Sequence, residues 1–340
     1  MENVLFKIRE NGKYGFMNQM GQVVIEPQYY DAENFYNGFS RVRFNNKLVP
    51  LDSLGRLLMK HLFNHVGNFE EDLAKAQLVS QWGYIDRRGS LAIDVQFEDA
   101  SDFSEGLAAV RTNGHFGYID HEGETVLKDS YDGAREFKSG FAAIEMDEAY
   151  GFINKEGEIV IEPQFEEVGN FQNEVAVITE NDQWGLINKQ GDWLIEPSFD
   201  VDDSYTNGVF FEGMALTSLD GKYGFINQQG EIIVGPMYDF AGDFGEGMAL
   251  IEINGAYGYL DTAGRLAILP KYEDAGVFSN GLAQVKVDGK WGYIDKKGNT
   301  IIEPKFQKVY PFKNGLARIE HNGMWAYISR EGKLVWREKE

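Results

Sequence analysis

Short apolar segments alternate with polar turn residues along the whole chain. Leu107–Val110 and Glu158–Ile161 are typical, because each follows a Gly and each is alternating or rich in β-branched side chains. Segments of this kind predict β-strands, since branched side chains fit a pleated, half-buried surface. No window of helical length that lacks Gly shows a clean 3.6-residue apolar period. The pattern therefore predicts an all-β protein.

One string recurs through the chain: aromatic, Gly, aromatic, aliphatic, Asn or Asp, two variable positions and Gly, as in Trp82–Gly89. It occurs ten times, at a spacing of 34 residues except for one spacing of 39. The copies begin at Tyr14, Leu48, Trp82, Phe116, Tyr150, Trp184, Tyr223, Tyr257, Trp291 and Trp325. A period of 34 also suits helical tetratricopeptide repeats, but the short strand-like segments exclude them.

The ninth copy shows how each unit resolves into three strands. The first is Trp291–Asp295, whose last residue opens a turn in which Asp caps its own backbone and the following Gly adopts a left-handed conformation. The second is Asn299–Glu303, which we expect to end at Pro304. A longer loop precedes the third strand, typified by Leu282–Val285, which turns back at Asp288 into the next copy.

The two ends of the chain match this unit. Leu5–Arg9 aligns with a third strand, and the last copy stops after its second strand near Trp336. Regrouped, residues 1–340 hold about ten antiparallel three-stranded units in a single array. No unit has enough apolar surface to fold alone, so stacking must supply the core. We expect a solenoid-like or superhelical body, with a closed propeller-like ring as the alternative.

These residues resemble the WG-repeat family, whose units read Lys-Trp-Gly-Tyr-Ile-Asp-x-x-Gly, then Glu-Pro, then Phe-x-x-Gly-Leu-Ala. Lys290–Ala317 is nearly a consensus copy, whereas the second unit departs from the pattern at Leu48–Pro50. The resemblance implies an all-β repeat array, mostly bacterial, with no catalytic signature to transfer. Some WG-repeat proteins resemble components of bacterial conflict systems, including neutralisers of toxins.

The net charge of the chain restricts the class of molecule that it is expected to bind. Lys and Arg total 32 against 54 for Asp and Glu, which gives a net charge of −22. This excess argues against binding nucleic acid or an anionic membrane and favours a basic protein. The chain has no Cys, no N-terminal signal pattern and no apolar run long enough to span a membrane, so we expect a cytoplasmic protein.

The sequence contains few candidate residues for catalysis, metal binding or ligand binding. Most aromatic residues fall in fixed repeat columns, where they are expected to fill the core rather than stack on sugars. The Asx-x-x-Gly turns lack the ligand spacing of calcium loops, so we predict no metal and no cofactor. An acid repeated in most units, for example Glu98 and Asp132, is expected to be structural. No nucleophile elbow, phosphate loop or dinucleotide fingerprint is present, and a small-molecule ligand is not expected.

The 39-residue unit breaks the repeat rule, and its longer loop places acids beside aromatic residues. Loops carry binding function more often than scaffolds do, so we predict a binding site here. Its residues are Asp200, Asp202, Asp203, Tyr205, Phe211 and Glu212, with Trp193 as an aromatic outside the columns. The sequence favours a non-catalytic binding protein, such as an immunity protein that neutralises a basic toxin. A polysaccharide or cell-wall binding module and a hydrolase with an unrecognised site are the alternatives.

Overall fold

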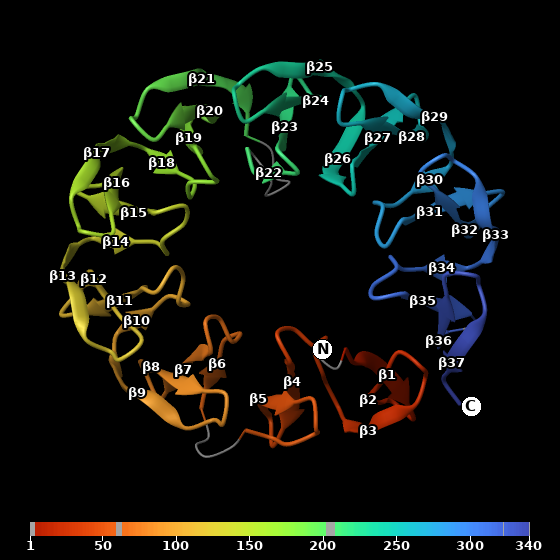
Figure 1. Ribbon diagram of the computed structural model, residues 1–340, viewed down its shortest axis with the longest axis horizontal. Helices are drawn as coiled ribbons and strands as arrows, with labels where there is room; N and C mark the ends of the chain where they lie inside the picture. The colour runs from red at the N-terminus through yellow and green to blue at the C-terminus, as the bar shows by residue number, and fades with distance from the viewer. Residues whose placement is uncertain (1–3, 59–62, 202–207, 322, 340) are drawn as a thin grey trace. The chain divides into compact units, whose positions relative to one another are not determined.

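The computed structural model describes residues 4–58, 63–201, 208–321 and 323–339, in which all regular structure is β. The strands form ten antiparallel sheets (Figure 1). Eight have four strands, while β1–β3 form a three-stranded sheet and β4–β5 a two-stranded one. The predicted tandem array of ten small antiparallel sheets is therefore confirmed for the described residues.

Each four-stranded sheet follows one order, in which consecutive strands are neighbours. The first strand is mostly a two-residue segment: β6 (His65–Val66), β10 (Asp99–Ala100), β14 (Gly133–Ala134), β18 (Glu167–Val168), β22 (Phe210–Phe211), β26 (Phe240–Gly245), β30 (Asp274–Ala275) and β34 (Lys308–Val309). The next strand is β1 (Phe6–Glu10), β4 (Phe39–Phe44), β7 (Leu73–Leu78), β11 (Ala108–Thr112), β15 (Phe141–Met146), β19 (Val175–Glu180), β23 (Met214–Leu219), β27 (Met248–Ile253), β31 (Leu282–Val287) and β35 (Leu316–His321).

The strand that carries the aromatic-Gly motif comes third. These strands are β2 (Lys13–Met17), β5 (Lys47–Asp52), β8 (Gln81–Asp86), β12 (His115–Ile119), β16 (Ala149–Asn154), β20 (Gln183–Asn188), β24 (Lys222–Asn227), β28 (Ala256–Asp261), β32 (Lys290–Asp295) and β36 (Met324–Ser329). The edge strands are β3 (Val23–Tyr29), β9 (Leu91–Phe97), β13 (Thr125–Tyr131), β17 (Ile159–Phe165), β21 (Trp193–Asp200), β25 (Ile232–Tyr238), β29 (Leu266–Tyr272), β33 (Thr300–Phe306) and β37 (Leu334–Arg337).

Two details of the predicted unit need correction. The loop before the long second strand contains a further short strand, so most sheets have four strands rather than three. The edge strand also continues past its Pro, since β33 runs from Thr300 through Pro304 to Phe306. The β32–β33 register shifts between Trp291 and Tyr293. Pro is tolerated there because a bulged edge strand does not need every N–H for the ladder.

The predicted turn is confirmed at Asp295. Its Oδ1 accepts the N–H of Lys297 at 2.9 Å and the N–H of Asn299 at 2.8 Å. Gly298 has a φ of 78°, the left-handed region that favours glycine. The motif therefore encodes its turn through contacts within five consecutive residues.

The chain divides into two compact units. Unit 1 is Met1–Asn18, Gln22–Ile178 and Asn188–Gly191, and unit 2 is Gln19–Gly21, Thr179–Ile187 and Asp192–Glu340. That residues 1–340 act as a single array stays a prediction.

Within each unit the core lies between successive sheets. In unit 1, Ala109 and Tyr118 of one sheet join Phe137, Ile144 and Ile153 of the next in one buried cluster. In unit 2, Phe225 and Val234 similarly join Phe244, Ile251 and Leu260. Their burial shows that the columns of Tyr118 and Phe137 fill the core and that stacking supplies it, whereas the first motif aromatic of most units, such as Tyr223, is only half-buried against the cluster.

Candidate binding surface

The acid that recurs in most units has a structural role, as expected. Asp132 Oδ2 accepts the N–H of Asp147 at 3.0 Å, and Asp239 Oδ2 accepts that of Asn254 at 2.7 Å, each at the hairpin turn between the second and third strands. Asp239 also accepts a hydrogen bond from the Lys222 ammonium. These contacts, led by the one to Lys222, hold the pKa of Asp239 below its usual value.

Four of the seven predicted site residues lie in the described part of the chain. Trp193 and Asp200 occupy opposite ends of the eight-residue strand β21, about 23 Å apart at the usual rise per residue. Asp200 Oδ2 accepts the N–H of Asp220 at 2.8 Å, the same turn contact that Asp132 makes in its own sheet. Asp202, Asp203 and Tyr205 lie outside the described residues.

Phe211 and Glu212 lie together at the tip between β22 and β23. Phe211 is 38% exposed. Glu212 Oε2 accepts the N–H of Gly247 in the next sheet at 2.6 Å. The same contact joins Glu105 to Gly140 in unit 1. Glu212 therefore has a recurring structural contact, and its part in binding stays a prediction.

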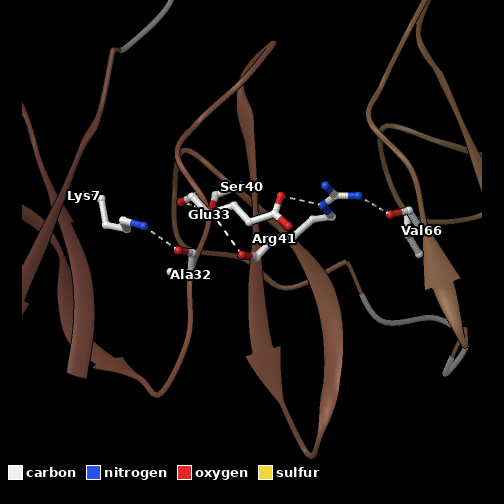
Figure 2. A network of polar contacts seen from close by, with 6 residues as sticks. All are labelled: Lys7, Ala32, Glu33, Ser40, Arg41 and Val66. Carbon is white, nitrogen blue, oxygen red and sulfur yellow. Dashed lines mark hydrogen bonds and ion pairs between the residues drawn. The ribbon is translucent and has the colours of Figure 1, made fainter. Parts of the chain in front are cut away.

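Basic side chains bridge neighbouring sheets, as Figure 2 shows for unit 1. Lys7 Nζ donates to the carbonyl oxygen of Ala32 at 2.8 Å, and Arg41 Nη1 donates to that of Val66 at 2.9 Å. Arg41 Nε also donates to Glu33 Oε2 at 2.7 Å, which orients the guanidinium. Cations used in this way hold the array together, while many carboxylates remain exposed to solvent.

Exposed carboxylates recur on the edge strands. The residue before the edge-strand Pro is an exposed Glu in four sheets: Glu26, Glu162, Glu196 and Glu303. Because these side chains repeat along both units, the negative charge is spread over the surface rather than confined to the long loop. The sequence pattern Glu-Pro could have revealed this series.

Histidine and carboxylate side chains are the groups of the described residues that could bind a metal ion. No group of three His, Asp or Glu there could hold a metal ion. His121 Nε2 lies 3.1 Å from Glu71 Oε2, and its ring stacks on Phe103 at 4.5 Å between centroids. These contacts give His121 a place in the packing of unit 1. No helix of the described chain is long and apolar enough to cross a membrane.

A shallow surface depression opens in unit 2. Its lining residues are Gly281, Leu282, Asp295, Ile301, Arg330 and Glu331. The lining combines two carboxylates and a guanidinium with apolar side chains.

The sequence reasoning missed three residues of the sheet β26–β29: Phe240, Glu252 and Tyr257. Phe240 stands where the equivalent strands of two other repeats have Asp99 and Asp274, and it is 40% exposed. The signal that could have found it is an aromatic residue at a position that is polar or Gly in six of the other short first strands, which have His65, Asp99, Gly133, Glu167, Asp274 and Lys308.

Comparison with solved structures supports the fold class. A structure described as "Crystal structure of the eukaryotic initiation factor" matches with a TM-score of 0.55 at 10% identity, covering 91% of this chain and 97% of that one. Kluyveromyces lactis Hsv2p gives a TM-score of 0.35 at 12% identity, covering 71% and 96%. Both matched proteins are β-propellers. The first match therefore shows a likeness in fold class to a β-propeller protein.

Sequence comparison identifies the family. No curated protein matches the chain. The family described as "WG containing repeat" matches eight segments: residues 14–47, 82–114, 116–148, 150–184, 184–223, 223–255, 257–291 and 291–325. The second unit, whose motif departs from the pattern at Leu48–Pro50, falls outside these segments. Because the matched segments cover most of the sequence, the chain belongs to the WG containing repeat family.

Proposed function

We propose that this protein is a non-catalytic binding protein that recognises a basic protein through its acidic surface. The observation that carries the proposal is the net charge of −22. Such a field raises the encounter rate with a positively charged partner and disfavours nucleic acid and anionic membranes.

The internal use of basic side chains strengthens this charge argument. Lys7 and Arg41 donate to carbonyl groups of neighbouring sheets, so their ammonium and guanidinium groups are engaged within unit 1. Glu162 and Glu303, by contrast, are exposed on edge strands. The surface offered to a partner is thus acidic in its exposed side chains, in agreement with the net charge of the whole chain.

In its most specific form, the proposal describes a cytoplasmic immunity-type protein that binds and neutralises a basic toxin. The support is the acidic surface together with the family resemblance to components of bacterial conflict systems. Polysaccharide binding is less well supported, because most of the aromatic columns that could stack on sugar rings are buried, as Tyr118 and Phe137 illustrate, and Tyr223 and Tyr257 of a further column are half-buried.

The test is capture of partners from a lysate of the source organism on the immobilised protein, followed by reconstitution with the purified partner. We expect one basic protein whose affinity falls at least tenfold when salt rises from about 0.1 to about 0.5 M, because screening shortens the range of charge interactions. A variant with Glu26, Glu162, Glu196 and Glu303 all changed to Gln should bind more slowly. Salt-independent binding, or binding on a glycan array without any protein partner, would contradict the proposal.

A further inference from the structure

One cross-strand row in unit 2 differs from the corresponding rows of other sheets. Phe240 of β26 lies opposite Glu252 of β27, which lies opposite Tyr257 of β28. Directly opposed residues in antiparallel strands point to the same face, so the three side chains are neighbours. We call Phe240, Glu252 and Tyr257 the aromatic-acid row.

The rings of this row continue toward the preceding sheet. The Phe240 ring centroid lies 6.4 Å from that of Tyr257 and 6.1 Å from that of Tyr223. Burial, followed by the neighbouring Glu252 carboxylate, raises the pKa of the Tyr257 hydroxyl above its usual value. Phe240 is 40% exposed, while Glu252 and Tyr257 are half-buried. The row thus presents π faces and a carboxylate on a partly exposed surface.

Equivalent rows in other sheets contain their own cation. In the row of Asp99, Arg111 and Phe116, the guanidinium lies 5.7 Å from the ring centroid of Phe116. In the row of Asp274, Lys286 and Trp291, the acidic Asp274 likewise lies directly opposite the basic Lys286.

Two further rows carry Glu at the position of Glu252, and each has a cation over its aromatic ring. The Arg135 guanidinium lies 5.4 Å from the ring centroid of Tyr150, in the row that contains Glu145. In the row of Glu320 and Trp325, the Arg318 guanidinium lies 4.0 Å from the Trp325 ring centroid.

Lys308 supplies a second cation in this last row. Its Nζ lies 3.7 Å from Glu320 Oε1. In these four sheets, then, an aromatic ring beside a carboxylate in this row is paired with a positive charge from the chain itself. The equivalent row of the sheet β18–β21, with Glu167, Thr179 and Trp184, also lacks a cation, but its Trp184 is fully buried and offers no ring to a partner.

The aromatic-acid row has none of these three cation positions filled. The residues equivalent to Lys308, Arg135 and Arg318 are Phe240, Gly242 and Leu250, all uncharged. The aromatic rings and the carboxylate are retained, but the cation these positions supply in other sheets is missing. A guanidinium or ammonium group binds such a site through the ring quadrupoles and the carboxylate together.

We propose that Phe240, Glu252 and Tyr257 form a binding site for an arginine or lysine side chain of a basic protein partner. The proposal rests on the proposed function and names the place at which that partner is anchored. The incoming side chain takes the position that Arg135 or Arg318 occupies in other sheets. Arginine is favoured over lysine, because its planar guanidinium stacks on rings while donating to a carboxylate.

The sharpest test supplies the missing cation from the chain itself. Gly242→Arg places an arginine where another sheet has Arg135, and a Cβ at Gly242 would meet only Leu250 Cβ, at an ordinary 3.8 Å. The matched control is Gly235→Arg on edge strand β25, where an added Cβ has no atom within 4 Å. Both variants change the net charge by the same amount, so only position distinguishes them.

The probe is a fluorescein-labelled peptide of six Arg-Gly repeats, titrated at low salt and followed by fluorescence anisotropy, with a Lys-Gly peptide for comparison. We expect Gly242→Arg, Phe240→Ala and Glu252→Gln each to weaken binding by about tenfold, while Gly235→Arg changes it by less than about twofold. The lysine peptide should bind more weakly. Far-ultraviolet circular dichroism checks that each variant is folded. If Gly242→Arg does not fold, Glu252→Gln tests the site in its place.

Two results would overturn the site. If the wild type fails to bind the arginine peptide, the row is not a cation site. If Gly242→Arg and Gly235→Arg weaken binding equally and Phe240→Ala has no effect, the peptide responds to overall charge alone. Neither result decides the proposed function, because the captured basic protein and its salt dependence are measured separately.

Discussion

The glycine of the aromatic-Gly motif gives the most direct test of the packing. A Cβ added at Gly224 in β24 would lie 2.4 Å from the carbonyl oxygen of Val234 and 2.7 Å from the nitrogen of Pro236. Both are backbone atoms of the edge strand β25, so no side-chain rotation relieves the overlap. The strand must move by about 1.0 Å to restore an ordinary contact, and we expect Gly224→Ala to lower the free energy of unfolding by about 3 kcal/mol.

The same sheet offers a matched control. Gly235 lies in β25, where an added Cβ meets nothing within 4 Å, so Gly235→Ala should change the free energy of unfolding by less than about 0.5 kcal/mol. Urea denaturation followed by tryptophan fluorescence would compare the two variants with the wild type. Equal midpoints for Gly224→Ala and Gly235→Ala would refute the close-approach explanation. The same contact recurs at Gly15, Gly151, Gly258 and Gly292, so the result would apply to other sheets.

Two further predictions concern the buried tyrosines. Tyr259→Phe should cost about 1–2 kcal/mol of unfolding free energy by calorimetry, because the Tyr259 hydroxyl donates to the carbonyl oxygen of Gly276 at 2.7 Å, whereas exposed Tyr30→Phe should cost nothing measurable. Burial raises the pKa of Tyr84, Tyr118, Tyr259 and Tyr293 above the ordinary 10.0, so the folded chain keeps protons that the unfolded chain releases. Their stabilising contribution is therefore complete below about pH 10 and is lost as the pH rises from there toward the raised pKa of the folded chain. An alkaline titration should show part of the tyrosinate absorbance rising only together with loss of near-ultraviolet circular dichroism. Ionisation of all 17 tyrosines near pH 10 without unfolding would contradict this.

The binding surface was only partly predictable from sequence. The long loop drew attention to Phe211 and Glu212 because it breaks the repeat spacing, and the structure places both at one tip. Phe240 breaks no spacing, and it becomes conspicuous only when β26 is paired with β27 and the charge pairs of equivalent rows can be compared. A missing cation is invisible until the register shows which residues should have supplied it.

What the sequence determined by itself is local. The Asx-x-x-Gly turn forms because the Asp295 side chain reaches backbone N–H groups two and four residues later, and repetition of that turn indicates ten units. Tertiary structure decided the rest. The short first strands contain too few residues to form without the partner strand that pairs with them, and Pro304 stays within β33 because the neighbouring strand admits a bulge. The motif glycine also depends on a non-local contact, since only the approach of the edge strand explains why a side chain is excluded there. Interactions within a few residues can be read from the chain, whereas those that depend on register or on the next sheet arise only when the strands pack together.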